Sequence, residues 1–249
     1  MTRNKKLLII SISVSLAVAL AITFITLAFT VWKPKVKTTQ EWLNDFKVCL
    51  VLSKDDSEQK TYKSITITED GSTVALYEHL VEIKTQNDEK IAHLSVKEEF
   101  PTLETDEFDT YDEYYFIDGT MYMQRIAASE TNGTSFGSTW AVFWEVVTEN
   151  LGSTNYDFTE SNFTDLILTH NEHTHSMTAT ITDSNKYKFL AGAEGLADMS
   201  GINVTMMFND ETGYYDLKIG YMYQDKQSVE ISISRTEPTD IEIKDFVQR

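Results

Sequence analysis

The chain has 249 residues and a formal net charge of −18, with 39 Asp and Glu against 21 Lys and Arg. The first 37 residues hold six of these bases and none of the acids, so the rest has 15 bases, 39 acids and a net charge of −24. Nucleic-acid phosphates and anionic lipid headgroups repel such a surface, which argues against nucleic acid as a partner. Hydrophobic residues make up 41% of the chain, enough for the core of about one ordinary domain.

The N-terminal region contains a long uncharged run. Residues 7–32, LLIISISVSLAVALAITFITLAFTVW, span 26 positions without a charge, whereas a bilayer core requires about 20 apolar residues. A cleavable signal peptide has a shorter apolar region, of roughly 7 to 15 residues, followed by a small-residue site. The length therefore favours an uncleaved transmembrane signal anchor, with the lipid bilayer as the partner of residues 7–32.

Basic residues flank this run equally, so the positive-inside rule does not decide its orientation. The short N-terminal tail and the acidic, strand-rich body favour a body outside the cytoplasm. The predicted organisation is a cytoplasmic tail at 1–6, a transmembrane anchor at 7–32, a linker at 33–38 and an extracytoplasmic domain at 39–249. The sequence thus predicts a single-pass protein of the cell membrane. Cys49 is the only cysteine, which excludes an internal disulfide and fits a small buried hydrophobe.

The body begins with a helix and continues with hairpins. Helical spacing predicts an amphipathic helix over about 39–52, with apolar residues Trp42, Phe46, Cys49 and Leu50. Alternation then predicts strands at 61–68, 73–84, 90–97, 112–117 and 120–126. Short connections at 69–72, 85–89 and Asp118-Gly119 favour antiparallel neighbours. Asp118-Gly119 indicates a type I′ turn, which needs positive φ at both central positions.

The second half mixes helices with strands. Residues 127–137 are small and polar, which predicts a mobile loop. An aromatic stripe at helical spacing predicts a second amphipathic helix over 139–151, with Trp140, Phe143, Trp144, Val147 and Leu151 on one side. Residues 158–170 fit either a short helix or a strand. A strand at 175–182, a third helix at about 184–197 and closing strands at 202–208, 214–223 and 228–235 complete the chain.

These elements predict an α+β domain with no further domain boundary after residue 38. One face of an antiparallel sheet is normally apolar, and the amphipathic helices need such a surface to lie on. The expected fold is a large curved antiparallel sheet, an unclosed half-barrel, wrapped around two or three helices. The alternative is a two-sheet sandwich that acts as an adhesion or interaction module, with the 139–151 helix packed outside.

Two stretches, YYFIDGTMYMQR (114–125) and VTMMFNDETGYYDLKIGYMY (204–223), resemble hairpins of the LolA-like superfamily of cell-envelope lipoprotein carriers and their exported relatives. The order of elements over roughly residues 38–245 is similar as well. The resemblance implies an unclosed barrel capped by helices, with an apolar cavity for acyl chains and without catalytic residues. A spanning anchor departs from the free or lipid-modified N-terminus of that family, so a freely diffusing shuttle is not expected.

Large apolar side chains near the 114–123 hairpin and the 139–151 helix are the predicted lining of this cavity. They are Trp140, Phe143, Trp144, Val147, Tyr115, Ile117, Met121 and Met123. Ligand sites are concave and largely apolar, and methionine adapts its shape to varied partners. The predicted function is therefore binding of a lipid or acyl chain, without enzymatic activity or a cofactor. The alternative is that these residues only fill the core of a structural, sensory or adhesion module of the cell envelope.

Residues 170–175, HNEHTH, concentrate three histidines. On a strand His173 and His175 share a face, and this pair could hold Zn²⁺ if a third ligand converged on it. A polar, solvent-facing strand entry explains the same residues without a metal. His79 and His93 stand singly in predicted strands and fit the role of cross-strand partners. The chain lacks a serine nucleophile elbow, a P-loop and a dinucleotide-binding loop.

Overall fold

The computed structural model describes residues 37–51, 57–86, 89–103, 109–127, 130–136, 139–151, 156–190 and 195–243. The chain divides into two compact units, Met1–Thr38 and Thr39–Arg249, and the second contains every helix and strand of the described residues. The predicted tail at 1–6, the anchor at 7–32 and most of the linker at 33–38 lie outside the described residues. In the ranges given above, no helix is long and apolar enough to cross a membrane.

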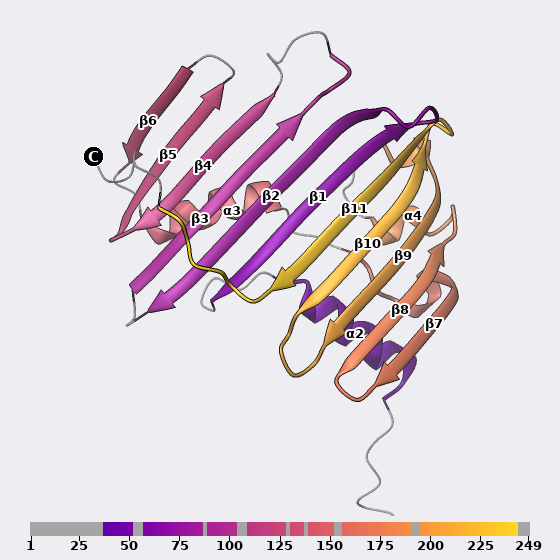
Figure 1. Ribbon diagram of the computed structural model, residues 1–249. Helices are drawn as coiled ribbons and strands as arrows, with labels where there is room; N and C mark the ends of the chain where they lie inside the picture. Colours follow the sequence, from indigo (N-terminus) through magenta and orange to yellow (C-terminus); the bar gives the residue numbers. More distant parts are fainter. Residues whose placement is uncertain are drawn as a thin grey trace, which may run out of the picture. The chain divides into compact units, whose positions relative to one another are not determined.

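Within the described residues, eleven antiparallel strands form one open sheet in the order β6-β5-β4-β3-β2-β1-β11-β10-β9-β8-β7 (Figure 1). The first and last strands of the chain pair with each other near the middle of the sheet. The strands are β1 Glu58–Thr68, β2 Thr73–Gln86, β3 Glu89–Glu99, β4 Thr110–Ile117, β5 Thr120–Ala127, β6 Glu130–Phe136, β7 Phe163–Asn171, β8 Thr174–Ile181, β9 Met199–Asn209, β10 Tyr215–Tyr223 and β11 Gln227–Thr236.

The single sheet confirms the predicted large antiparallel sheet and contradicts the two-sheet sandwich. Each predicted strand is present with shifted ends, and the two additional strands, β6 and β7, form the two edges. The mobile loop predicted at 127–137 is wrong, because β6 pairs with β5 from Ala127↔Glu130 to Met121↔Phe136. A strand ladder uses backbone groups, so small polar residues can form it. Residues 158–170 become a 3₁₀ turn, η2 Glu160–Asn162, followed by β7.

The α-helices in the described residues are α2 Thr39–Cys49, α3 Trp140–Leu151 and α4 Lys186–Phe189, and they lie on one side of the sheet (Figure 1). We call this side the helix face and the other side the opposite face. The helix predicted at 184–197 is too long, because α4 has only four residues and a 3₁₀ turn, η3 Leu196–Asp198, follows. Gly195 has a φ of +68°, a left-handed conformation that interrupts a right-handed helix.

Buried side chains on the helix face form two hydrophobic clusters. The α2 cluster combines Leu43 and Phe46 with residues of β8 to β11. The α3 cluster combines Phe143 and Val147 with residues of β2 to β5. Tyr62 of β1 packs at the border of both clusters, so the centre of the sheet is where the two cores meet.

The C-terminal segment, residues 237–243, crosses the opposite face over β1 and β2 (Figure 1). The Thr239 backbone N–H donates to Gln59 Oε1 at 3.3 Å, and the Thr239 hydroxyl donates to Glu82 Oε1 at 2.7 Å. Lys84 Nζ lies 2.6 Å from Asp240 Oδ1. Part of the second sheet face is thus covered by the chain itself.

Candidate functional site

The aromatic helix α3 packs against β2, β4 and β5 on the helix face. Phe143 and Val147 are completely buried, whereas Trp140 and Trp144 are half-buried at the edge of the α3 cluster. This is the pattern expected for an amphipathic helix whose apolar stripe faces a sheet. The two tryptophans therefore combine contact with the core and partial access to solvent.

The β4–β5 hairpin divides the other predicted lining residues between the two sheet faces. Its turn, Asp118-Gly119, has φ values of +50° and +73° and confirms the predicted hairpin turn. Met121 and Met123 are paired with residues that contact the α3 cluster, so they share the helix face with α3. Tyr115 and Ile117 point to the opposite face, because successive strand side chains alternate. The structure thus brings six of the eight predicted residues together and separates these two.

The half-buried Trp140 joins α3 to the hairpin through ring contacts. Its ring lies 5.1 Å from Phe116 in an edge-to-face arrangement and is stacked on Phe143 at 5.4 Å. Lys90 Nζ lies 4.6 Å above the Trp140 ring. Aromatic pairs at these distances stabilise the packing beyond the area they bury. The N-terminal end of α3 is thereby fixed on β3 and β4.

His79 of β2 holds the other end of α3. It is 6% exposed, and its Nδ1 lies 2.6 Å from the backbone carbonyl of Asn150. A carbonyl is only an acceptor, so Nδ1–H is the donor in this bond. His79 Nε2 is buried and, among the described residues, has no hydrogen-bond partner.

Three side chains surround His79 on the helix face. Tyr62 is its cross-strand partner on β1, with a ring separation of 5.6 Å. Glu98 Oε1 on β3 lies 3.7 Å from His79 Nε2, and Glu98 is paired with Tyr77 of β2. Burial raises the pKa of Tyr77, and the negative charge of Glu98 raises it further. We call these four residues, Tyr62, Tyr77, His79 and Glu98, the His79 subsite.

A second histidine explains how the opposite face of the β4–β5 hairpin is covered. Tyr115, which is completely buried, stacks on His93 with ring centres 4.5 Å apart. His93 Nδ1 lies 3.0 Å from Glu82 Oε2, and its Nε2 contacts Glu113. Burial alone lowers the pKa of His93, but the hydrogen bonds to Glu113 and Glu82 outweigh it and raise the pKa. The predicted role of His93 as a cross-strand partner is confirmed.

Charged residues are buried where the two hydrophobic clusters meet. Lys60, 2% exposed, donates from Nζ to the Leu50 carbonyl at 3.1 Å, near the end of α2. Glu58, 1% exposed, lies 3.3 Å from Arg235 Nε. Burial lowers the pKa of Lys60 to about 8; Glu58 opposes this shift and Arg235 adds to it. The predicted strand began at residue 61, so the sequence did not indicate that Glu58 and Lys60 are buried.

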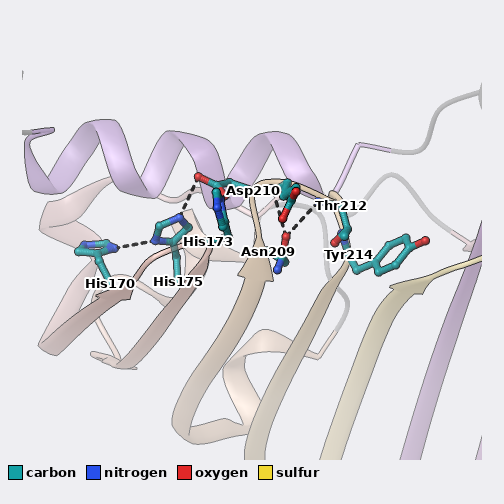
Figure 2. Close-up of polar contacts among 8 residues, drawn as sticks. His170, His173, His175, Asn209, Asp210, Thr212 and Tyr214 are labelled. Carbon is teal, nitrogen blue, oxygen red and sulfur yellow. Dashed lines mark hydrogen bonds and ion pairs between the residues drawn. The ribbon is translucent and has the colours of Figure 1, made fainter. Parts of the chain in front are cut away.

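His173 and His175 contact Asp210 at one end of β8 and β9, and His170 contacts His175 (Figure 2). His173 Nδ1 lies 3.0 Å from Asp210 Oδ1, and His175 Nε2 lies 3.2 Å from Asp210 Oδ2 without hydrogen-bond alignment. His170 Nδ1 is 3.2 Å from His175 Nδ1, and Trp42 of α2 stacks on His170 at 3.9 Å. The contacts from His175 and His173 lower the pKa of Asp210.

This arrangement corrects the expected geometry of the histidines. His173 lies in the β7–β8 turn, exposed, and His175 lies in β8, buried, so the two do not share a strand face. Across the residues that the structure describes, no group of three His, Cys, Asp or Glu side chains is placed to hold a metal ion. Through the stacking of Trp42 on His170, this histidine cluster joins the edge strand β7 to α2.

Comparison with protein-family models gives no match, and comparison with curated proteins gives none either. Among solved structures, the chain is similar to the crystal structure of LprF from Mycobacterium bovis, with a TM-score of 0.31 and 11% sequence identity. The alignment covers 83% of this chain and 96% of that chain. At this score the similarity assigns neither a family nor a ligand to this chain.

Proposed function

We propose that this protein is a non-enzymatic binding protein, anchored in the cell membrane by residues 7–32, that holds a lipid or acyl chain between its sheet and α3. The observation that carries the proposal is the incomplete burial of apolar groups around α3. Trp140 and Trp144 pack against the buried α3 cluster together with half-buried Tyr114. Apolar surface that is continuous with a core and still accessible is a suitable contact for an apolar ligand.

The architecture agrees with this proposal. An open antiparallel sheet with helices on one face is the arrangement expected of a LolA-like carrier. We include in the proposal that this chain is related to the LolA-like superfamily. Met121 and Met123 lie on the helix face, and Met121 belongs to the α3 cluster against which the tryptophans pack. Flexible methionine side chains allow the site to adapt to chains of different shape.

Ligand retention tests the binding function. Residues 38–249 keep the compact unit Thr39–Arg249 whole, and cooperative unfolding of this fragment verifies its fold. The fragment is purified from cells and extracted with organic solvent, and mass spectrometry is expected to find co-purified lipid. A lipid-free fragment that also fails to bind a fluorescent fatty acid contradicts the proposal and leaves a structural or sensory module.

Protease treatment of intact cells tests the proposed topology. The uncharged run at 7–32 and the acidic body support a body outside the cytoplasm. We therefore expect added protease to digest residues 38–249 while a cytoplasmic marker protein stays intact. Complete protection of the body would place it inside the cell.

A further inference from the structure

The His79 subsite contains a buried acceptor that the fold leaves without a partner. The Asn150 carbonyl fixes the proton of His79 on Nδ1, so neutral His79 presents a lone pair at Nε2. This atom is buried and unpartnered among the described residues. A buried polar group without a hydrogen bond destabilises the fold, so a native protein normally supplies a partner.

The geometry around this lone pair selects the partner. Glu98 Oε1 lies 3.7 Å from His79 Nε2, too far for a direct hydrogen bond, and both atoms are acceptors when His79 is neutral. A donor atom bound to both would lie about 2.8 Å from each of them. It needs two protons to satisfy both acceptors at once. A primary ammonium provides them, as a water molecule does, whereas the hydroxyl of an alcohol headgroup satisfies only one.

Charge and aromatic surroundings favour the same group. Glu98 carries a negative charge and is 32% exposed, so its carboxylate is reachable from solvent. The half-buried ring of Tyr62 lies 5.6 Å from the His79 ring, and half-buried Tyr77 is the cross-strand partner of Glu98. Aromatic rings attract ammonium groups. A carboxylate headgroup would instead meet Glu98 as a like charge, in a chain whose net charge is −18.

We propose that His79 and Glu98 bind the ammonium headgroup of an amphiphile whose apolar chain lies along α3. This inference rests on the proposed function and names the ligand class of the same site. The subsite adjoins the apolar region, because Tyr62 packs against the α3 cluster and His79 contacts the C-terminal end of α3. The headgroup thus occupies one end of α3, and the chain extends towards Trp144 and Trp140.

Photolabelling of the full chain in phosphatidylcholine nanodiscs tests the proposal. Three decyl probes with a diazirine in the chain differ only in their headgroup, which is an ammonium, a hydroxyl or a carboxylate. Labelled peptides are identified by mass spectrometry. The amount of label on β1, β2 and α3 is divided by the amount on residues 7–32, which corrects for differences in how strongly the three probes partition into the bilayer. We expect the ammonium probe to exceed the carboxylate probe by about tenfold or more, as for a charge-assisted hydrogen bond.

Matched variants assign the preference to the subsite. Glu98→Gln should reduce ammonium labelling to the hydroxyl level, and His79→Gln should reduce it as well. Glu99→Gln is the control, because Glu99 lies on the opposite face, where it contacts Tyr111 and Lys97. It should retain the full ammonium preference.

The failures of the two proposals are distinguishable. Equal labelling of β1, β2 and α3 by all three probes would overturn the ammonium site and leave the apolar site standing. No labelling of these elements by any probe would overturn both. A direct ion pair between His79 and Glu98 is the competing explanation. It predicts that Glu98→Gln lowers the thermal midpoint but leaves the order of the three probes unchanged, and that result would overturn the proposal.

Discussion

Lys60 makes the stability of the fold depend on pH at the scale of one residue. The pKa of this lysine is about 8 in the folded protein, against 10.5 as its ordinary value. Between these values the unfolded chain binds more protons, so the destabilising effect of burying the ammonium is full below pH 8 and is lost as pH rises towards 10.5. The group is almost completely buried, so solvent screening of the effect is small.

Denaturation of the wild type and of Lys60→Met at several pH values tests this link. The methionine has no titrating group, so the difference between the two proteins isolates Lys60. From about pH 7.5 to about pH 10 we expect the free energy of unfolding of the wild type to rise by about 2 kcal/mol relative to the variant. A constant difference would show that the pKa of Lys60 is normal.

His93 gives the opposite pH dependence. Its pKa is raised in the fold by the carboxylates of Glu113 and Glu82, which outweigh burial. The stabilisation is therefore complete below the unfolded pKa of about 6.5 and is lost as pH rises through the raised folded pKa. Urea denaturation should show a larger loss of stability for His93→Gln at pH 6 than at pH 9. A loss that is equal at both pH values would contradict the assigned ion pairs.

The helix α3 offers a test at the scale of one element. Phe143 is fully buried against the sheet, whereas its neighbour Val142 is 40% exposed. Phe143→Ala should lower the free energy of unfolding by about 3 to 5 kcal/mol, because it leaves a cavity in the α3 cluster. Val142→Ala should change it by only about 0.5 kcal/mol. Similar losses for both variants would show that α3 does not present this face to the sheet.

Hydrophobic alternation predicted the inner strands of the sheet, but it left the edge strand β7 open between helix and strand and missed the edge strand β6, for a physical reason. An edge strand has a neighbour on one side only, so fewer of its side chains are buried. In β7 the alternation also breaks between Thr164 and Ile167, where Asp165 has a φ of +51° and Ile167 is 63% exposed. In β6 the residues are small and polar, which is also the composition of a loop.

The candidate site was predictable in its residue types but not in its geometry. Tyr115 and Phe116 are both large and aromatic, and strand alternation places them on different faces. Only the register of β3, β4 and β5 decides that Phe116, and not Tyr115, faces α3. The lone pair of His79 depends on a contact with Asn150, which is 71 positions away in the chain. A periodic pattern carries no information about such contacts, because it describes one element at a time.

At the scale of the whole molecule, the sheet separates two environments. The helix face carries both hydrophobic clusters and the His79 subsite, and the opposite face is partly covered by residues 237–243. The acidic balance of the chain disfavours anionic ligands. The accessible apolar surface along α3 is where we propose that an apolar chain binds. The position of a bound chain relative to the tryptophans tests this proposal most directly.

Fluorescence quenching by a brominated decylamine measures this position. The fragment 38–249 contains three tryptophans, Trp42, Trp140 and Trp144. In Trp42→Phe only the two tryptophans of α3 remain, and we expect saturable quenching on titration. In the double variant Trp140→Phe, Trp144→Phe only Trp42 of the α2 cluster remains, and saturable quenching should be absent. Absence of saturable quenching in Trp42→Phe, or equal quenching in both variants, would contradict a ligand site along α3.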